Sequence, residues 1–298
     1  YIQNLTIPDS VIMIQYNAFE YCSNLLNVYF HSNVQLKIDH FAFQYCRQLS
    51  EVFLPRGVHS IDYGPFRACE NLKSIEVDLS NPKYKSINGV LFNKNEQEIV
   101  QYPASKEDDT YIIPDSVTYI QSHCFSYSQI TRCFVLPQSI LTIRPYTFEY
   151  CANLVNIMIP DNVRYIENHA FSHCTRLETV VLSMNLLSIS SAAFEFCSNL
   201  PFILLPESLT MLSASTFDSC RNLQSITIPS MIHSIEPLTF HECLHLENVT
   251  LTDGLVSIFF SSFYSCTSLK RINLPDSVIT IDSYVFQHCS ALDNIIIP

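Results

Sequence analysis

The stretch from Ile157 to Leu177 reads Ile-Met-Ile-Pro-Asp-Asn-Val-Arg-Tyr-Ile-Glu-Asn-His-Ala-Phe-Ser-His-Cys-Thr-Arg-Leu, and variants of it recur along almost the whole chain. Eight of the ten steps between equivalent phenylalanines span 23 residues, one spans 24 and one spans 59. A fixed period of about 20 to 50 residues is typical of a solenoid, in which each repeat packs only on its neighbours. The phenylalanines equivalent to Phe171, called marker phenylalanines below, are Phe19, Phe43, Phe66, Phe125, Phe148, Phe194, Phe217, Phe240, Phe263 and Phe286.

Each copy predicts a short strand followed by a compact arm. In the first copy Leu5 and Ile7 alternate around a polar residue, and Pro8 ends the strand because proline cannot donate to a following ladder bond. The apolar residues after it, from Val11 to Phe19, have the spacing of a tight helical or 3₁₀ segment. We therefore expect an α/β repeat solenoid with a parallel sheet on one side and short helical or 3₁₀ arms on the other.

The repeat predicts a single domain over residues 1–298, with about twelve repeats and an irregular insertion at 78–110. Within the insertion, Gly89 to Phe92 and Glu98 to Tyr102 are apolar runs joined by a polar link, which indicates a hairpin. It is either a functional appendage or a wide repeat, and we favour the wide repeat. Both ends of the sequence fall inside repeats without polar caps, so we expect a fragment that is open at both ends and able to associate end to end.

Charge and composition exclude several function classes. The net charge is −12, from 28 acidic and 16 basic residues, without a basic cluster, which disfavours nucleic acid and anionic membranes as partners. Only four glycines are present, so phosphate-cradling loops are not expected. No apolar run approaches the roughly 18 to 20 residues that span a bilayer, and we expect no membrane insertion in this segment. The first residues also lack the basic and apolar regions of a signal peptide.

The pattern Leu-x-x-Ile-x-Ile-Pro-x-x-Val-x-x-Ile-x-x-x-Ala-Phe-x-x-Cys resembles the BspA-like class of leucine-rich repeat, over essentially the whole chain. The hairpin at 88–94 and Tyr102-Pro103 look like an interruption that is common in that class. The resemblance implies a right-handed coil with a concave parallel sheet. It also implies a microbial surface protein that attaches to host or matrix proteins. The chain departs from the family in lacking a glycine before most of its Ala-Phe pairs.

The twelve cysteines allow a disulfide, a metal or a core interpretation. Because one cysteine per repeat lies at the same place, we expect a column inside the coil, and cysteine behaves there as a small buried hydrophobe. Ser128 replaces it in one copy, so the column does not need a partner everywhere, and free buried thiols are favoured over disulfides. Cys124 and Cys133 lie outside the column, where burial is not required. The column contains Cys22, Cys46, Cys69, Cys151, Cys174, Cys197, Cys220, Cys243, Cys266 and Cys289.

Two histidine clusters suggest metal binding at first. His169 and His173 flank Cys174, and His241 and His245 flank Cys243. Since each cysteine belongs to the core column, we expect the histidines to face solvent and not to converge with it on one tetrahedral centre. No serine stands in a Gly-x-Ser-x-Gly elbow. We therefore predict no metal, no cofactor and no enzymatic activity.

Side chains that point outward from the strands are the candidates for partner binding. The residues nine and eleven after each marker phenylalanine are apolar and point inward, so those at eight and ten point outward. Val135, Met158, Val181 and Leu204 would then form one apolar stripe. Such stripes commonly mark a partner site, although β-branched residues also suit strands and another segment could cover them. The predicted partner-binding residues are Tyr29, Phe53, Val135, Met158, Val181, Phe202 and Leu204.

We therefore predict a non-enzymatic protein-binding solenoid, located at the cell surface or secreted, that recognises a host or matrix protein. The rival hypothesis is a cytoplasmic scaffold that binds its neighbours in a larger assembly, because cytosolic proteins keep their thiols reduced. Asn4-Leu5-Thr6 and Asn248-Val249-Thr250 are formal glycosylation acceptors, a triplet that arises often by chance.

Overall fold

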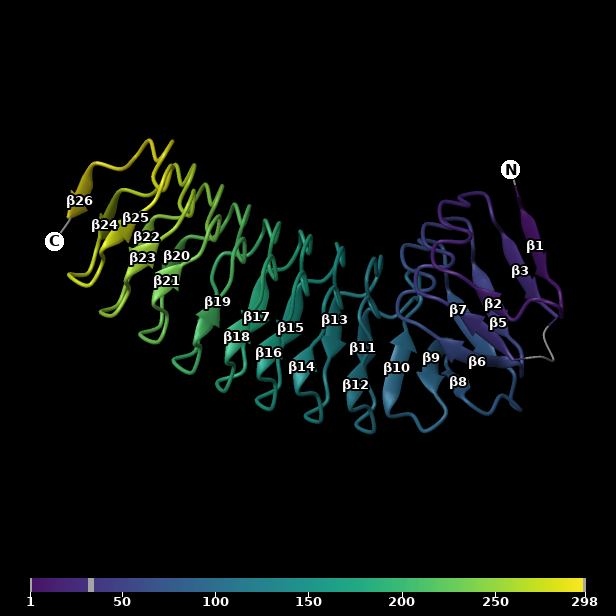
Figure 1. The fold of residues 1–298 in the computed structure, drawn as a ribbon. Helices are drawn as coiled ribbons and strands as arrows, with labels where there is room; N and C mark the ends of the chain where they lie inside the picture. Colours follow the sequence, from purple (N-terminus) through teal and green to yellow (C-terminus); the bar gives the residue numbers. More distant parts are fainter. Residues whose placement is uncertain (1, 32–34, 297–298) are drawn as a thin grey trace. The chain divides into compact units, whose positions relative to one another are not determined.

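The computed structural model describes residues 2–31 and 35–296 and consists of successive turns of parallel β-strands (Figure 1). The chain divides into two compact units. Unit 1 comprises Tyr1–Thr131 and Thr147–Cys151, and unit 2 comprises Arg132–Tyr146 and Ala152–Pro298. Most turns carry a first strand, often followed by a proline, and a second strand before the arm. The prediction of one domain over 1–298 stays a prediction.

In unit 1 the strands of the first row form two-stranded parallel sheets, β1 with β3 and β5 with β7. The second row forms a three-stranded sheet in the order β2-β4-β6. The bounds are β1 (Asn4–Ile7), β2 (Met13–Ile14), β3 (Asn27–Phe30), β4 (Leu36–Ile38), β5 (Glu51–Leu54), β6 (Val58–Ile61), β7 (Ser74–Val77), β8 (Tyr84–Ile87), β9 (Val90–Asn93), β10 (Glu98–Gln101), β11 (Thr110–Ile112) and β12 (Tyr119–Ile120).

In unit 2 the first row pairs β13 with β15 and β15 with β17, then β20 with β22 and β24 with β26, all in parallel. The second row forms the sheets β14-β16-β18-β19 and β21-β23-β25. The bounds are β13 (Cys133–Val135), β14 (Thr142–Ile143), β15 (Asn156–Met158), β16 (Tyr165–Ile166), β17 (Thr179–Val181), β18 (Ser188–Ile189), β19 (Met211–Leu212), β20 (Ser225–Thr227), β21 (Ser234–Ile235), β22 (Asn248–Thr250), β23 (Ser257–Ile258), β24 (Arg271–Asn273), β25 (Thr280–Ile281) and β26 (Asn294–Ile296).

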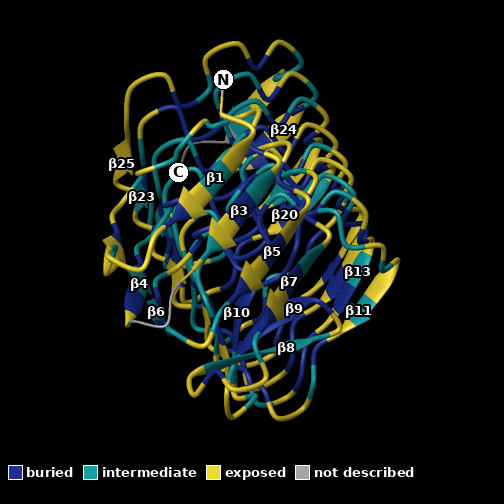
Figure 2. Ribbon diagram, turned by 90° about the vertical axis from the view of Figure 1, so that its right-hand side faces the viewer, coloured by how far each residue is buried: buried dark blue, intermediate teal, exposed yellow. Residues whose placement is uncertain are grey.

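Stacked aromatic rings form the centre of the core. In unit 2 the ring of Phe171 stacks on that of Phe194, with centroids 5.2 Å apart and planes 4° apart, and the stack continues to Phe286 at spacings up to 5.8 Å. Unit 1 has the same arrangement, for example between Phe125 and Phe148 at 5.1 Å. Burial alternates along the first-row strands, with one inward and one outward side chain in turn (Figure 2). The repeat therefore places identical residues in contact in successive turns.

The predicted helical arms are not formed, because residues 2–31 and 35–296 contain no helix. In every arm the residues two before and two after the marker phenylalanine have a positive φ, as at His169 (53°) and His173 (61°), which prevents a helix. The arms instead bond to the next turn. His169 N donates to Ser191 O at 3.1 Å, and Phe171 N and His173 N donate to residues of the following arm at 2.8 Å.

The insertion is one wide turn of unit 1. Tyr102 takes the place of a marker phenylalanine: its ring is buried 5.4 Å from that of Phe125, and its N–H donates to Cys124 O at 2.9 Å, as marker N–H groups do elsewhere. Strands β9 and β10 form the antiparallel hairpin expected from the sequence, β8 adds a second antiparallel pairing with β9, and β10 pairs in parallel with β12. The insertion therefore continues the second strand row and does not stand apart as an appendage.

Candidate functional site

The outward side of the first row in unit 2 carries the largest part of the predicted stripe. Val135, Met158 and Val181 are register partners on β13, β15 and β17, and all three side chains are exposed, Met158 by 67%. They line a hollow of about 370 Å³. Cys133, Asn156 and Thr179, the residues eight after each marker, form its other wall. The hollow is lined mainly by apolar residues, with Gln138, Asn156 and Thr179 as its polar lining, which is the composition of a small binding site.

The strand ladder stops after β17, which the sequence pattern did not predict. Pro201 lacks the N–H that would donate to the preceding turn, and Phe202 makes only an isolated bridge to Ser225. Leu204 is therefore not part of a strand, although it is 87% exposed and lies one turn beyond Val181. Phe202 is also exposed. The stripe thus continues past Val181 as two exposed side chains on an irregular segment.

Tyr29 and Phe53, the other two predicted residues, belong to unit 1. Both are exposed, and with Val28, Phe30 and His31 they line a smaller hollow of about 190 Å³. The predicted partner-binding residues therefore form two groups. The group in unit 2 has the larger hollow and is the candidate site.

A polar hollow lies further along the same row of unit 2. Strands β22 and β24 are neighbours that belong to different sheets, and a space of about 270 Å³ lies over them. Its polar lining consists of Asn248, Thr250, Arg271 and Asn273, all exposed. Sequence reasoning missed this hollow, although the outward position of Arg271, eight residues after Phe263, was the available signal.

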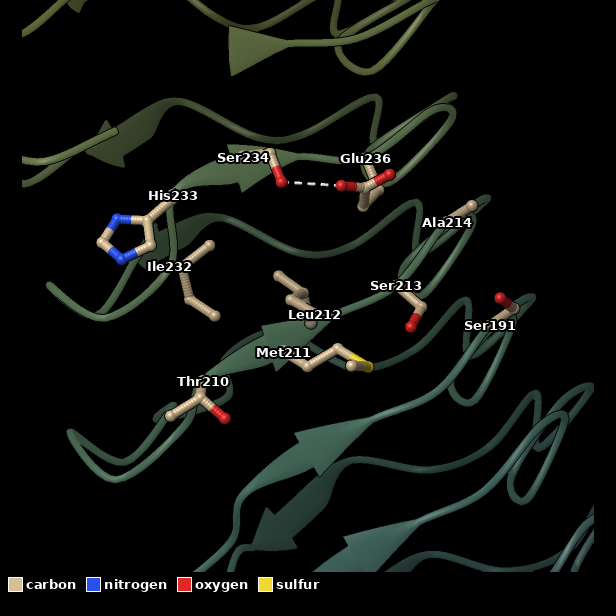
Figure 3. A pocket seen from close by; sticks show the side chains of 10 residues that line it. All are labelled: Ser191, Thr210, Met211, Leu212, Ser213, Ala214, Ile232, His233, Ser234 and Glu236. Carbon is tan, nitrogen blue, oxygen red and sulfur yellow. Dashed lines mark hydrogen bonds between the residues drawn. The ribbon is translucent and has the colours of Figure 1, made fainter. Parts of the chain in front are cut away.

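A third hollow, of about 470 Å³, lies on the second row of unit 2, where β19 and β21 belong to different sheets. Figure 3 shows His233 and Glu236 at its two ends, with Met211 between them on the preceding turn. Ser234 Oγ donates to Glu236 Oε1 at 2.6 Å. Two small residues, Ser191 and Ala214, also line it.

The cysteine column has a structural role. In at least eight of the described turns the Sγ atom donates to the carbonyl oxygen of the marker phenylalanine in the preceding turn, at 3.1 to 3.2 Å, as Cys197 does to Phe171. Burial raises the pKa of Cys197, which keeps its thiol protonated and able to donate. Ser128 is buried without a partner for its Oγ within the described residues. Of the two cysteines outside the column, Cys124 is buried and Cys133 is half-buried at the apolar hollow.

Most histidines of the two suspected metal clusters bind the neighbouring turn, so the expectation that they all face solvent is wrong. His169 Nδ1 lies 3.5 Å from Glu195 Oε2, and His241 Nδ1 lies 2.9 Å from Asp218 Oδ1. Hydrogen bonds from His169 lower the pKa of Glu195, whereas burial raises the pKa of Asp218. Cys243 points instead to the Phe217 carbonyl. His245 is exposed and bonds to a backbone carbonyl.

A different group, Asp39, His40 and Asp62, brings its ligand atoms within 4.8 Å of one another in unit 1. Lys37 Nζ already lies 2.9 Å from Asp62 Oδ2 and 4.0 Å from Asp39 Oδ1. An ammonium at that place neutralises the carboxylates and repels a metal cation. The residues therefore fit an internal ion pair better than a metal site.

Comparison with known proteins agrees with this geometry. The family model described as BspA type leucine rich repeat region (6 copies) matches residues 1–109, 107–224 and 210–298. A leucine-rich repeat protein from Bacteroides ovatus is 25% identical, with a TM-score of 0.62 over 98% of this chain and 86% of that one. A leucine-rich repeat protein from Eubacterium ventriosum is 23% identical, with a TM-score of 0.60 over 98% and 84%. The pneumococcal vaccine antigen PcpA is 22% identical, with a TM-score of 0.61 over 100% and 68%. No curated protein matches the chain.

The parallel sheet, the stacked turns and the exposed apolar hollow define a leucine-rich repeat solenoid, a class whose members generally bind other proteins. The chain belongs to the BspA-type leucine-rich repeat family. That family is typically non-enzymatic. Across the described residues, no helix has the length and apolar character needed to cross a membrane.

Proposed function

We propose that this chain is a recognition module of a cell-surface or secreted protein and binds a host or matrix protein through the first strand row of unit 2. The observation that carries the proposal is the hollow of about 370 Å³ lined by Val135, Met158 and Val181. Exposed apolar side chains in register on adjacent strands are costly in water unless a partner covers them. The likeness to a pneumococcal antigen and to bacterial leucine-rich repeat proteins supports a microbial surface setting.

The site is tested by placing a charge on it. In Val181→Asp and Leu204→Asp the carboxylate would be buried against an apolar partner, so we expect capture of that partner to fall at least about tenfold. The intact chain is first used to capture proteins from candidate host matrix material, and the captured protein is identified. Binding of that protein to each variant is then measured. Met211→Asp is the matched control, because the exposure of Met211 lies between those of Val181 and Leu204 but Met211 is on the second row. Equal capture by all variants would remove the site from consideration.

A cytoplasmic scaffold is the second candidate, favoured by the eight buried thiols that bond to backbone carbonyls. In a reducing compartment such thiols stay reduced and do not form disulfides. Treating intact producing cells with a membrane-impermeant biotin reagent distinguishes the two. Labelling of the exposed lysines supports the surface module, and labelling only after lysis supports the scaffold.

A further inference from the structure

Arg271 is the only charged residue among the outward positions of the first row in unit 2. The positions eight after the marker hold Cys133, Asn156, Thr179, Phe202, Ser225, Asn248, Arg271 and Asn294, and those ten after it, up to Asn273, are likewise uncharged. The row therefore contains one positive charge and no carboxylate, in a chain whose net charge is −12. Such an arrangement attracts an acidic group.

The guanidinium of Arg271 lies in a setting that suits one kind of ligand. Arg271 lines the hollow of about 270 Å³ together with Asn248, Asn273 and Thr250. Glu247, on the adjacent turn, has its own ion-pair partner in Lys270, at 3.8 Å. Guanidinium and amide groups are hydrogen-bond donors, and the planar guanidinium fork matches the two oxygens of a carboxylate.

The polar and apolar hollows lie on the same face of the same unit. Five turns separate β15, at the centre of the apolar hollow, from β24. At about 4.8 Å per strand this corresponds to about 24 Å, the length of about seven residues of extended chain. One bound segment can therefore reach both hollows.

We propose that Arg271, with Asn248 and Asn273, binds an aspartate or glutamate side chain of the same protein partner whose apolar side chains occupy the hollow at Met158. This assignment deepens the proposed function and rests on it. The partner is an acidic-apolar segment with its carboxylate about seven residues from its apolar anchor. The carboxylate sets register and specificity, and the apolar anchor supplies most of the binding energy.

The test uses fluorescein-labelled fourteen-residue peptides of glycine, serine and threonine that carry two adjacent leucines and one aspartate about seven residues away, made in both orders. Binding to the full chain is followed by fluorescence anisotropy. Replacing the aspartate with asparagine should weaken binding about tenfold, and Arg271→Gln should weaken the aspartate peptide by the same factor without affecting the asparagine peptide. Arg271→Lys should restore only part of the loss, because an ammonium lacks the fork.

Lys270→Gln is the matched control, since Lys270 is adjacent, exposed and already paired, and should leave binding unchanged. The carboxylate assignment is overturned if aspartate and asparagine peptides bind equally, if neither binds, or if a phosphoserine peptide binds more than about tenfold tighter than the aspartate peptide. A different result would contradict the proposed function while leaving the carboxylate assignment in place. In that result Val181→Asp does not change the binding of the leucine-containing peptides, whereas Arg271→Gln still weakens binding of the aspartate peptide.

Discussion

At the level of single residues, the backbone explains how this chain dispenses with the glycine expected before the Ala-Phe pair. The position two before the marker phenylalanine is left-handed in all eleven arms, and only Gly64 (φ 61°) is a glycine there. Leu238 (φ 60°) and Ala192 (φ 55°) adopt the same conformation. Each costs about 1 kcal/mol relative to glycine. The bonds from arm N–H groups to the next turn hold these residues in place, for example Ala192 N to Ala214 O at 3.1 Å.

Glycine substitutions at two adjacent alanines test this explanation. Ala192→Gly relieves the strain of the left-handed backbone. It also lowers stability by about the same amount, because glycine increases the entropy of the unfolded chain. We therefore expect a free energy of unfolding within about 0.5 kcal/mol of the wild type. Ala193→Gly relieves no strain and should cost about 1 kcal/mol. Both side chains are buried, which makes the pair a matched comparison by urea denaturation. Equal losses would show that the left-handed backbone carries no strain.

At the level of elements, the ring stack and the arm ladder replace the helices that the spacing of apolar residues suggested. A compact arm with an apolar residue every three or four positions fits a helix and a chain of tight turns equally well, so the pattern alone cannot separate them. The strands were predictable because their alternation and their closing prolines are local. The broken strand at Phe202 was not predicted, although Pro201 was a local signal for it.

Phe171→Ala tests the stack. The ring is fully buried and lies 5.2 Å from that of Phe194, and the neighbouring turns cannot easily collapse into the space it leaves. We expect a loss of roughly 3 to 5 kcal/mol in the free energy of unfolding, measured by chemical denaturation. Phe196→Ala, which truncates a partly exposed arm ring, should cost less than half as much. A loss below about 1 kcal/mol for Phe171→Ala would contradict a core role.

At the level of the whole molecule, the wide turn brings together residues far apart in the sequence. Within unit 1, Arg67 Nη2 donates to Glu149 Oε2 at 2.6 Å across 82 positions, and Arg67 Nη1 donates to Tyr45 Oη at 3.2 Å. Both members of the ion pair are almost buried. His123 lies beside them, 3.8 Å from Glu149. Burial, assisted by the charge of Arg67, lowers the pKa of His123 to about 3.

This lowered pKa predicts a loss of stability in mild acid. An unfolded histidine takes up a proton near pH 6.5, whereas the folded His123 stays neutral, so its contribution is present above pH 6.5 and is lost as the pH falls toward 3. Between pH 7.5 and 5.5, His123→Asn should lose about 1 kcal/mol less than the wild type. Asparagine tolerates the left-handed backbone at this position (φ 62°). Denaturation curves at the two pH values measure the difference, and parallel losses would contradict a buried neutral histidine.

The repeat by itself determined the solenoid, the inward positions, the cysteine column and the exposure of Met158 and its neighbours on the strands, because these follow from local periodicity of 2 and of 23 residues. The tertiary structure decided what depends on adjacent turns: the left-handed arms, the thiol-to-carbonyl bonds, the hollows and the cluster at Arg67. Such features arise from how side chains of successive turns fit together. A pattern read along one copy carries no information about that fit.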